Sequence, residues 1–252
     1  MRQDGRRNET GRQEEMKHYG IIGKPLEHSW SARWFTEMFR REGIDADYKA
    51  FETEADTILP PVPLDGFNVT CPYKEAVIPL LDELDPVAAE IGAVNTVVRR
   101  GSRLIGCNTD WLGFTAAIKM SIVNSQLSTA LVLGTGGAAK AVIYALRRLG
   151  IAVTSVSRDP QKGLPYSALT QEIISRHLLL INCTPLGMFP DISSMPAIPY
   201  DGISSRHILF DCIYNPAETL FLREGRLRGA VTLNGLSMLT SQAEAAWQLW
   251  NS

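Results

Sequence analysis

A glycine-rich turn is the stretch whose residue types and spacing point most directly to chemistry. Gly134, Gly136 and Ala139 follow an apolar run that ends at Leu133, and they have the G-x-G-x-x-G/A spacing of dinucleotide-binding turns. The first glycine permits a tight turn, the second lets the backbone approach a pyrophosphate, and the small third residue lets a helix pack closely on the sheet. Backbone N–H groups at the start of that helix favour an anion. Because such turns also occur without a nucleotide, the flanking elements decide the interpretation.

A strand–helix–strand unit surrounds this turn. Helical periodicity continues to Gly150, and a β-branched run over residues 151–156 follows, so we expect parallel strands joined by a right-handed crossover. Two further apolar runs, 177–182 and 207–212, fit parallel strands of the same sheet. In open α/β sheets ligands bind beyond the carboxyl ends of the strands. On that ground the candidate ligand-binding residues are Thr184, Asp211, Tyr214 and Asn215.

The residues before the turn show a different pattern of short strands and helices. Strands are expected at 19–23, 47–51, 66–69, 93–98 and 104–107. Helices are expected around 34–39, from near Tyr73 with a break at Pro79, at 111–120 and at 236–250. The later switch to regular alternation of strands and helices places a domain boundary near Asp110. The fold class is therefore α/β, with an N-terminal α/β domain followed by a Rossmann-like dinucleotide-binding domain.

Composition restricts the classes of partner. The chain has 252 residues and a formal net charge of -2, which gives no broad basic field for nucleic acid or an anionic membrane, so we expect a small-molecule partner. The four cysteines form no C-x-x-C pair and the four histidines no H-x-x-x-H pair, which argues against a disulfide framework or a metal site and favours the cytoplasm. Neither a signal peptide nor a membrane-spanning run is apparent. Residues 1–15 are expected to be a disordered extension.

Eight short motifs, in one order along nearly the whole chain, resemble the shikimate dehydrogenase family. They are GKPLEHSWS, NVTCPYKE, IGAVNTV, GCNTDWLGF, GTGGAA, NCTPLGM, YNPAET and NGLSMLTSQAEAAW. The resemblance implies reversible reduction of 3-dehydroshikimate to shikimate with NADPH, on the route to chorismate and aromatic amino acids, without a metal. It also implies a substrate-binding domain over residues 16–110, completed by C-terminal helices at 235–252, and an NADP-binding Rossmann domain over 111–234.

The resemblance also assigns a catalytic pair. Lys74 and Asp110 match the family residues that handle the proton of the reacting hydroxyl. Hydride transfer at a secondary alcohol requires loss of that proton, and the reverse reaction requires a donor at the carbonyl oxygen. Lys74 can polarise the carbonyl and donate, while Asp110 orients the lysine or exchanges the proton itself.

The remaining site residues are likewise implied by the resemblance. Ser29 and Ser31 match the pair that holds the substrate carboxylate, and Tyr214 matches a residue near it. The ring hydroxyls are matched by Thr70, Asn95, Asp110 and Gln242. The candidate cofactor-binding residues are Gly134, Thr135, Gly136, Gly137, Ala138, Ala139, Ser157, Arg158, Lys162, Thr184 and Gly235.

The sequence departs from the family pattern at several positions. Ala32, Tyr73 and Trp111 replace the usual proline, histidine and glycine, and the large ring of Trp111 can reshape the groove beside Asp110. After the second strand of the Rossmann unit, Arg158 favours a 2′-phosphate and hence NADP(H), whereas Asp159 favours a free ribose hydroxyl.

Three alternatives remain open from the sequence. A quinate or shikimate dehydrogenase with NAD or dual cofactor use is the nearest alternative. Asp159 suggests it, because an acid at this position favours a free ribose hydroxyl. A non-catalytic shikimate-binding relative is the alternative of another class, although such a protein need not retain Lys74 and Asp110. The assembly is either a monomer or a homodimer.

Overall fold

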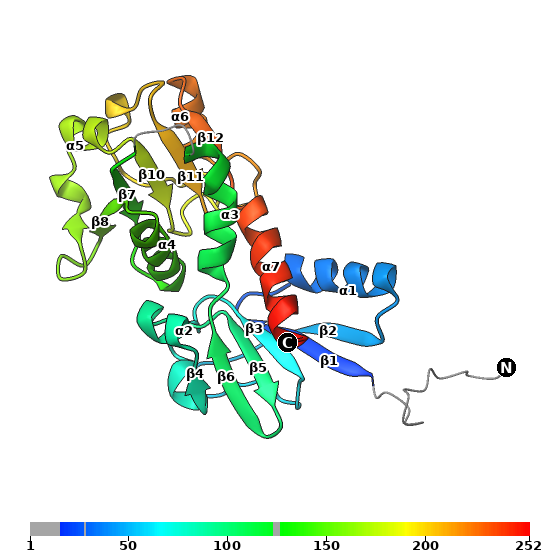
Figure 1. Ribbon diagram of the computed structural model, residues 1–252. Coiled ribbons are helices and arrows are strands. Elements are labelled where there is room, and N and C mark those ends of the chain that lie inside the picture. Colours follow the sequence, from blue (N-terminus) through cyan, green and yellow to red (C-terminus); the bar gives the residue numbers. More distant parts are fainter. Residues whose placement is uncertain (1–15, 28, 123–126) are drawn as a thin grey trace.

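Two six-stranded sheets form the framework of the protein (Figure 1). The structure, a computed structural model, describes residues 16–27, 29–122 and 127–252, so the expected disordered extension at 1–15 lies outside the described residues. The first sheet has the order β2-β1-β3-β5-β6-β4 and is mixed, because β3 pairs with β5 and β5 with β6 in antiparallel fashion. The second has the order β12-β11-β10-β7-β8-β9 with parallel pairing throughout. This arrangement confirms the predicted fold class.

The first sheet and its helices come from the N-terminal half. Their bounds are β1 (Lys17–Gly23), α1 (Trp30–Glu42), β2 (Ala46–Glu52), β3 (Gly66–Val69), β4 (Glu83–Leu84), α2 (Pro86–Ile91), β5 (Thr96–Arg100) and β6 (Arg103–Cys107). The aromatic stripe of α1 packs on this sheet, where Phe35 stacks on Tyr48 with ring centroids 4.5 Å apart. The stripe is therefore part of the hydrophobic core.

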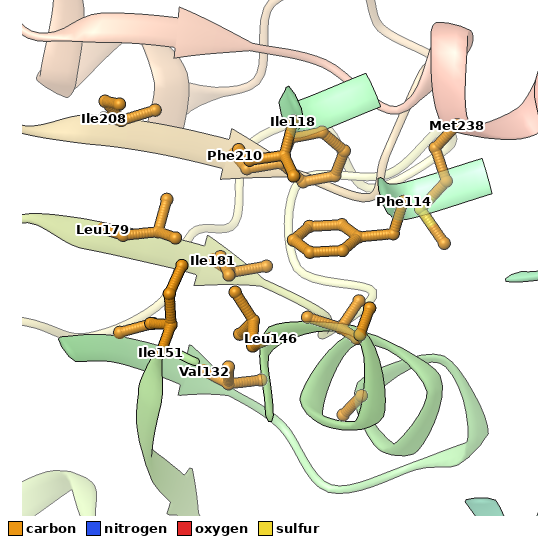
Figure 2. Packing of buried hydrophobic residues seen from close by; sticks show 14 residues of the cluster. Phe114, Ile118, Val132, Leu146, Ile151, Leu179, Ile181, Ile208, Phe210 and Met238 are labelled. Carbon is orange, nitrogen blue, oxygen red and sulfur yellow. The ribbon is translucent and has the colours of Figure 1, made fainter. Parts of the chain in front are cut away.

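The second sheet and its helices follow after β6. Their bounds are α3 (Asp110–Ile122), β7 (Thr129–Leu133), α4 (Gly137–Arg148), β8 (Ala152–Ser157), β9 (Leu164–Pro165), α5 (Gln171–Arg176), β10 (Leu179–Asn182), β11 (Ile208–Asp211), α6 (Leu220–Leu227), β12 (Val231–Leu233) and α7 (Leu236–Trp250). Helices α3 and α4 and the start of α7 bury one face of the sheet, where Phe114, Phe210 and Met238 meet (Figure 2). Helices α5 and α6 bury the opposite face.

Helix α7 connects the two halves. It starts beside the second sheet and ends against the first (Figure 1). At its C-terminal end, the buried Trp250 donates a hydrogen bond from Nε1 to the carbonyl of Val97, 3.0 Å away. The ring also fills the space beside Gly66, where a Cβ would come within 2.3 Å of Nε1. The last turn of the chain is thus built into the core of the first domain.

One predicted helix is wrong. Instead of a helix from near Tyr73, residues 71–77 form turns, followed by a 3-10 helix at Ile78–Leu80. An α-helix would need the Lys74 carbonyl to accept from the amide of Ile78, but that carbonyl accepts from Val94, 2.7 Å away, and Ile78 bonds to Glu75. Pro79, at the next position, supplies no donor. The backbone of Lys74 is therefore held by a hydrogen bond from Val94, just before β5, and not by a helix.

Candidate active site

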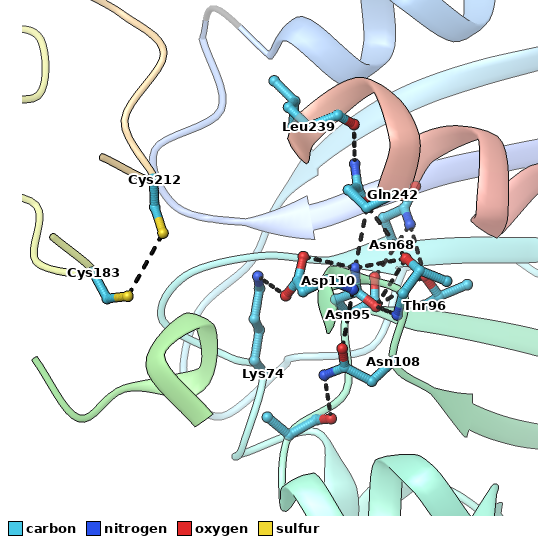
Figure 3. Close-up of polar contacts among 12 residues, drawn as sticks. Asn68, Lys74, Asn95, Thr96, Asn108, Asp110, Cys183, Cys212, Leu239 and Gln242 are labelled. Carbon is cyan, nitrogen blue, oxygen red and sulfur yellow. Dashed lines mark hydrogen bonds and ion pairs between the residues drawn. The ribbon is translucent and has the colours of Figure 1, made fainter. Parts of the chain in front are cut away.

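An ion pair between Lys74 and Asp110 lies where the two halves meet (Figure 3). Lys74 Nζ and Asp110 Oδ2 are 2.7 Å apart, and their side chains are 17% and 7% exposed. Lys74 comes from the turn after β3, and Asp110 is the first residue of α3, where its backbone amide donates to Asn108 Oδ1. A carboxylate at a helix N-terminus also has a favourable interaction with the helix dipole. The pair is shielded from water and fixed from both sides.

Asn95, just before β5, organises the groups around this pair. Three acceptors lie within hydrogen-bonding distance of its Nδ2, namely Asp110 Oδ1 at 3.0 Å, Gln242 Oε1 at 3.1 Å and Thr109 Oγ1 at 2.9 Å. The two N–H groups of Nδ2 are therefore shared among these three acceptors. Its Oδ1 accepts from the amide of Thr109 at 2.7 Å. Both carboxylate oxygens of Asp110 therefore have partners, one in Lys74 and one in Asn95, so its orientation is fixed.

Gln242 reaches the same cluster from α7, 147 residues further along the chain than Asn95. Its Nε2 donates to the carbonyl of Leu239 at 2.9 Å, which turns Oε1 toward Asn95. Helices α3 and α7 come close because residue 113 is glycine: a Cβ there would lie 2.4 Å from the Met238 carbonyl. A side chain at 113 would separate Asp110 from Gln242.

Sequence reasoning missed part of this polar cluster. Tyr48 donates to Asn68 Oδ1 at 2.7 Å, and Asn68 Nδ2 donates to Thr96 Oγ1 and to the Asn95 carbonyl. Thr109 belongs to the cluster as well. A signal was present for Asn68 alone, because a polar residue inside an apolar strand needs a partner when it is buried. The motifs NVT and NTD hold Asn68 and Thr109 next to residues that were singled out.

The candidate carboxylate-binding residues lie around the start of α1. Ser29 is the N-cap of α1, and its Oγ accepts from the amide of Ala32 at 3.3 Å. Ser31 is buried in the first turn of the helix, as its second residue. Tyr214 approaches from the loop after β11, where burial raises its pKa while Arg33 and a hydrogen bond from the Trp30 backbone lower it. In the described part of the chain, no hydrogen bond joins these side chains to the Asn95 cluster.

Thr70 directly precedes the turn that carries Lys74. Its amide donates to the carbonyl of Ile22, so it continues the pairing of β3 with β1. Its methyl group fills the space beside Gly23, where a Cβ would lie 2.3 Å from Thr70 Cγ2. The structure thus positions Thr70 four residues before Lys74, at the end of a fully buried strand.

The two departures beside the catalytic candidates have structural roles. Tyr73 is buried and donates from its hydroxyl to the Thr53 carbonyl at 2.6 Å, which anchors the turn that carries Lys74. Trp111 packs edge-on against Tyr144 of α4, with centroids 5.4 Å apart. Its ring thus belongs to a small apolar cluster that joins α2 and α4.

The glycine turn between β7 and α4 has the geometry that a dinucleotide needs. Gly134 has φ 106°, a conformation that favours glycine, and a Cβ at Gly136 would meet no heavy atom within 4 Å. Gly136 caps α4 without a side-chain hydrogen bond, which leaves backbone N–H groups at the helix start for an anion. At Gly137 a Cβ would lie 2.9 Å from Lys74 Cβ. The glycine turn and Lys74 are therefore neighbours.

The other cofactor candidates lie along the ends of β8, β10 and β12. Ser157 Oγ accepts from the amide of Asp159, and Asp159 Oδ1 accepts from Gln161, so this acid is turned into its own loop. Lys162 Nζ lies 3.9 Å from Asp159 Oδ2. Arg158 is exposed, and in the described residues it forms no ion pair. The arginine is free to meet a phosphate, whereas the acid is engaged.

Thr184 and Gly235 lie beyond the carboxyl ends of β10 and β12 in the second sheet. Thr184 donates from Oγ1 to Asn182 Oδ1 at 2.6 Å, and Asn182 in turn donates to Asp211. Gly235 caps α7, and a Cβ there would lie 2.1 Å from the Cys212 carbonyl. Asp211 itself is fully buried with Thr219 as a further donor, and burial raises its pKa to about 6. Its carboxylate therefore links the loops that follow β10 and β11 through hydrogen bonds.

An ion pair bridges the two halves beside the turn. Lys140 of α4 reaches Glu75, the residue after Lys74, with Nζ and Oε2 2.6 Å apart.

Within the described residues, no cluster of three or more His, Cys, Asp or Glu side chains could hold a metal ion. No helix of the described chain is long and apolar enough to cross a membrane.

Comparison with known proteins identifies the first half. Residues 21–97 match the family described as the shikimate dehydrogenase substrate binding domain. The shikimate dehydrogenase (NADP(+)) of Symbiobacterium thermophilum is 37% identical over 92% of this chain and 87% of its own length. The match to that relative extends across both sheets.

Solved structures match the whole arrangement. Shikimate 5-dehydrogenase from Thermus thermophilus, in complex with NADP(H) and shikimate, is 35% identical with a TM-score of 0.84, over 93% of both chains. Quinate dehydrogenase from Corynebacterium glutamicum, in complex with NAD, is 27% identical with a TM-score of 0.82, again over 93% of both chains. The fold is therefore shared by enzymes that differ in substrate and cofactor.

Proposed function

Because this chain belongs to the shikimate dehydrogenase family, we propose that Lys74 and Asp110 handle the hydroxyl proton in its reaction. The resemblance drawn from the sequence motifs is thereby confirmed. The enzyme reversibly reduces 3-dehydroshikimate to shikimate with NADPH, in the pathway to chorismate and aromatic amino acids. The observation that carries the proposal is the buried ion pair whose carboxylate is also fixed by Asn95.

The geometry of the pair supports a role in proton transfer. NADPH, when bound, supplies the hydride. Lys74 Nζ uses one N–H for Asp110 Oδ2, which leaves its other donors for the oxygen of the substrate. In the reduction Lys74 polarises the carbonyl and donates a proton to its oxygen, and in the oxidation it holds the hydroxyl while the pair takes the proton. Asp110 keeps Lys74 at one position throughout, because Asn95 prevents the carboxylate from rotating.

We assign the substrate to the surface that surrounds the pair. Thr70, Asn95, Asp110 and Gln242 bind the ring hydroxyls, and Ser29, Ser31 and Tyr214 bind the carboxylate. Support comes from the hydrogen-bonded cluster that joins Asn95, Asp110 and Gln242. Buried polar groups left unpaired by a wrong substrate cost enough free energy to discriminate against it.

We assign NADP(H), the cofactor of the enzyme, to the carboxyl ends of the second sheet. The pyrophosphate lies on the turn from Gly134 to Ala139, where the start of α4 has no side-chain cap. Arg158, assisted by Lys162 and Ser157, binds the 2′-phosphate, while Thr184 and Gly235 border the nicotinamide end. The exposed guanidinium of Arg158 and the internal hydrogen bonding of Asp159 support the preference for NADP over NAD.

The domain boundaries follow from these assignments. We propose that residues 16–110 with 235–252 form the substrate domain and residues 111–234 the cofactor domain; the placement of Gln242 and Trp250 supports this division. We further propose a cytoplasmic location, which the four free thiols support, and a monomer or homodimer as the assembly.

The test crosses two substrates with two cofactors on the purified full chain. We expect reduced nicotinamide to appear with shikimate and NADP, and kcat/KM to be lower with quinate or with NAD. A higher kcat/KM for quinate with NAD would instead favour the quinate dehydrogenase alternative, which the similarity to the Corynebacterium enzyme motivates. Tight shikimate binding without turnover would favour a non-catalytic relative.

A further inference from the structure

Two cysteines outside the cluster around Asn95 face each other at the carboxyl ends of β10 and β11 in the second sheet. Cys183 directly follows β10 and Cys212 directly follows β11, and their Sγ atoms are 3.6 Å apart (Figure 3). Asn182 and Asp211 are register partners in the parallel strands, so the two cysteines occupy the next matching positions. Neighbouring strands lie about 4.8 Å apart, which is inside the Cα separation range that disulfides tolerate.

We propose that Cys183 and Cys212 form a reversible disulfide and that this modification weakens NADP(H) binding. The oxidant is a small-molecule disulfide of the glutathione type. The thiolate of one cysteine attacks a sulfur of glutathione disulfide, whose S–S bond breaks and releases one glutathione. The second cysteine then attacks the protein sulfur of this mixed disulfide and releases the second glutathione. Two electrons pass from the protein sulfurs to glutathione disulfide, and the two thiol protons end on the two glutathione products.

The order of attack follows from the surroundings of the two thiols. The hydrogen bond with Cys183 and then burial raise the pKa of Cys212, with smaller contributions from Asp211 and Asp110. The proposal therefore gives the second attack to Cys212 and the first to Cys183. Once it carries glutathione, the hydrogen bond that keeps Cys212 protonated is lost. Both residues are partly exposed and pack at the margin of the core cluster that contains Phe114 and Phe210. The proposal requires that this exposure admits a small reagent.

The coupling to the cofactor arises from the backbone of both cysteines. The Cys183 carbonyl oxygen lies 3.2 Å from where a Cβ of Gly134 would be, in the phosphate-binding turn. The Cys212 carbonyl oxygen lies 2.1 Å from the corresponding position at Gly235. Bond formation draws the sulfurs from 3.6 Å to about 2 Å, which displaces segments packed directly on two proposed cofactor-binding residues.

The other two cysteines lack this arrangement. Cys71 is exposed and Cys107 is buried, and neither has a second thiol as a hydrogen-bond partner in the described chain. Burial is also the main reason that the pKa of Cys107 is raised to about 12, which keeps it unreactive. They therefore serve as internal controls for the pair.

The test equilibrates the full chain in glutathione redox buffers with and without NADP, followed by acid quenching, thiol blocking and peptide mass mapping. We expect a peptide pair linked through Cys183 and Cys212, and an NADP Kd about fivefold or more higher in the oxidised protein. By linkage, saturating NADP must lower the ratio of reduced glutathione squared to glutathione disulfide at half-oxidation by the same factor. Reduction with dithiothreitol must restore the original Kd.

Two variants make the result specific. Cys212→Ser removes the linked peptide and the oxidation-dependent change in Kd, whereas Cys71→Ser retains both. Absence of the linked peptide in the wild-type chain at every ratio overturns the proposal, and so does a linked protein with unchanged Kd. Because Kd is read by nucleotide titration without turnover, this outcome is independent of whether Lys74 and Asp110 are catalytic.

Discussion

The substrate cluster and the cofactor loop of this protein are built in opposite ways. The cluster around Asn95 is buried and draws its side chains from the segments after β3 and before β5, from α3 and from α7. In the loop after β8, Arg158 is exposed, and Asp159 bonds only to residues two or three positions away within the described chain. If the proposed assignments hold, substrate recognition depends on the packed core and cofactor choice on a few surface residues. Substitutions in the buried cluster should then be tolerated less well than substitutions in the exposed loop.

The largest expected effect comes from removing the ion pair between Lys74 and Asp110 on the substrate side. Lys74→Ala and Asp110→Asn should each lower kcat by about 10²- to 10⁴-fold, because each removes a positioned proton-transfer group. The double variant should be no slower than the worse single variant, since the residues act as a unit. Steady-state kinetics with shikimate and NADP measures all three.

Lys49→Ala is the matched control, because Lys49 also pairs with an aspartate but is 65% exposed. It should leave kcat unchanged. Fully additive losses in the double variant would show that Lys74 and Asp110 act separately.

The cofactor side of the comparison is sharpened by Arg158→Ala. A charge-assisted hydrogen bond is worth about 1.5–3 kcal/mol, so the KM for NADP should rise by roughly 10- to 100-fold. The KM for NAD should stay the same, because NAD lacks the 2′-phosphate. The KM for shikimate should also stay the same, because the arginine has no partner in the cluster around Asn95. Arg147→Ala, an exposed arginine at the end of α4, is the control. An equal rise for NAD would place Arg158 elsewhere on the nucleotide.

Gln242→Ala tests whether the C-terminal helix belongs to the substrate side. Loss of the Oε1 acceptor leaves Asn95 with one partner fewer, so kcat/KM for shikimate should fall about tenfold. The KM for NADP should not change. Gln248→Ala, exposed on the same helix, should behave like the wild type. A selective defect in NADP binding would assign α7 to the cofactor side instead.

The smallest expected effect concerns pH and Asp211. Burial raises the pKa of this carboxyl to about 6, so the native state binds the proton more tightly than the unfolded chain. Its charged form destabilises the fold above that pH, and the penalty is relieved as the pH falls. The unfolding free energy of the wild type should therefore gain roughly 1 kcal/mol over Asp211→Asn between about pH 7 and pH 5. Parallel pH dependences in denaturant titrations would contradict this.

Local patterns in the sequence predicted most elements of the fold. The strand expected at 66–69 is β3, and the helix expected at 236–250 is α7. The periodicities that predict them depend on neighbouring residues, so they are visible in one sequence. The helix near Tyr73 was wrong because the Lys74 carbonyl is taken by Val94, a contact from a distant segment.

The polar cluster could be predicted only in part for the same reason. The resemblance brought Lys74, Asp110, Asn95 and Gln242 into consideration, but nothing local to Asn68 or Thr109 shows that they face the same centre. Their partners come from other strands and helices, so the pairing exists only in the folded chain. By contrast, the interactions of Asp159 are short-range and follow from its loop.

The burial of Trp250 against Gly66 and Val97 has a consequence for synthesis. The first domain emerges from the ribosome early, yet its core includes a ring and a helix that are synthesised after the second sheet. During translation a domain usually folds as a unit once its own residues have emerged. We therefore expect the first sheet to complete its core only after Trp250 has been added, when the strands of the second sheet have already been synthesised. This expected order of folding is the reverse of the order of the two sheets along the chain.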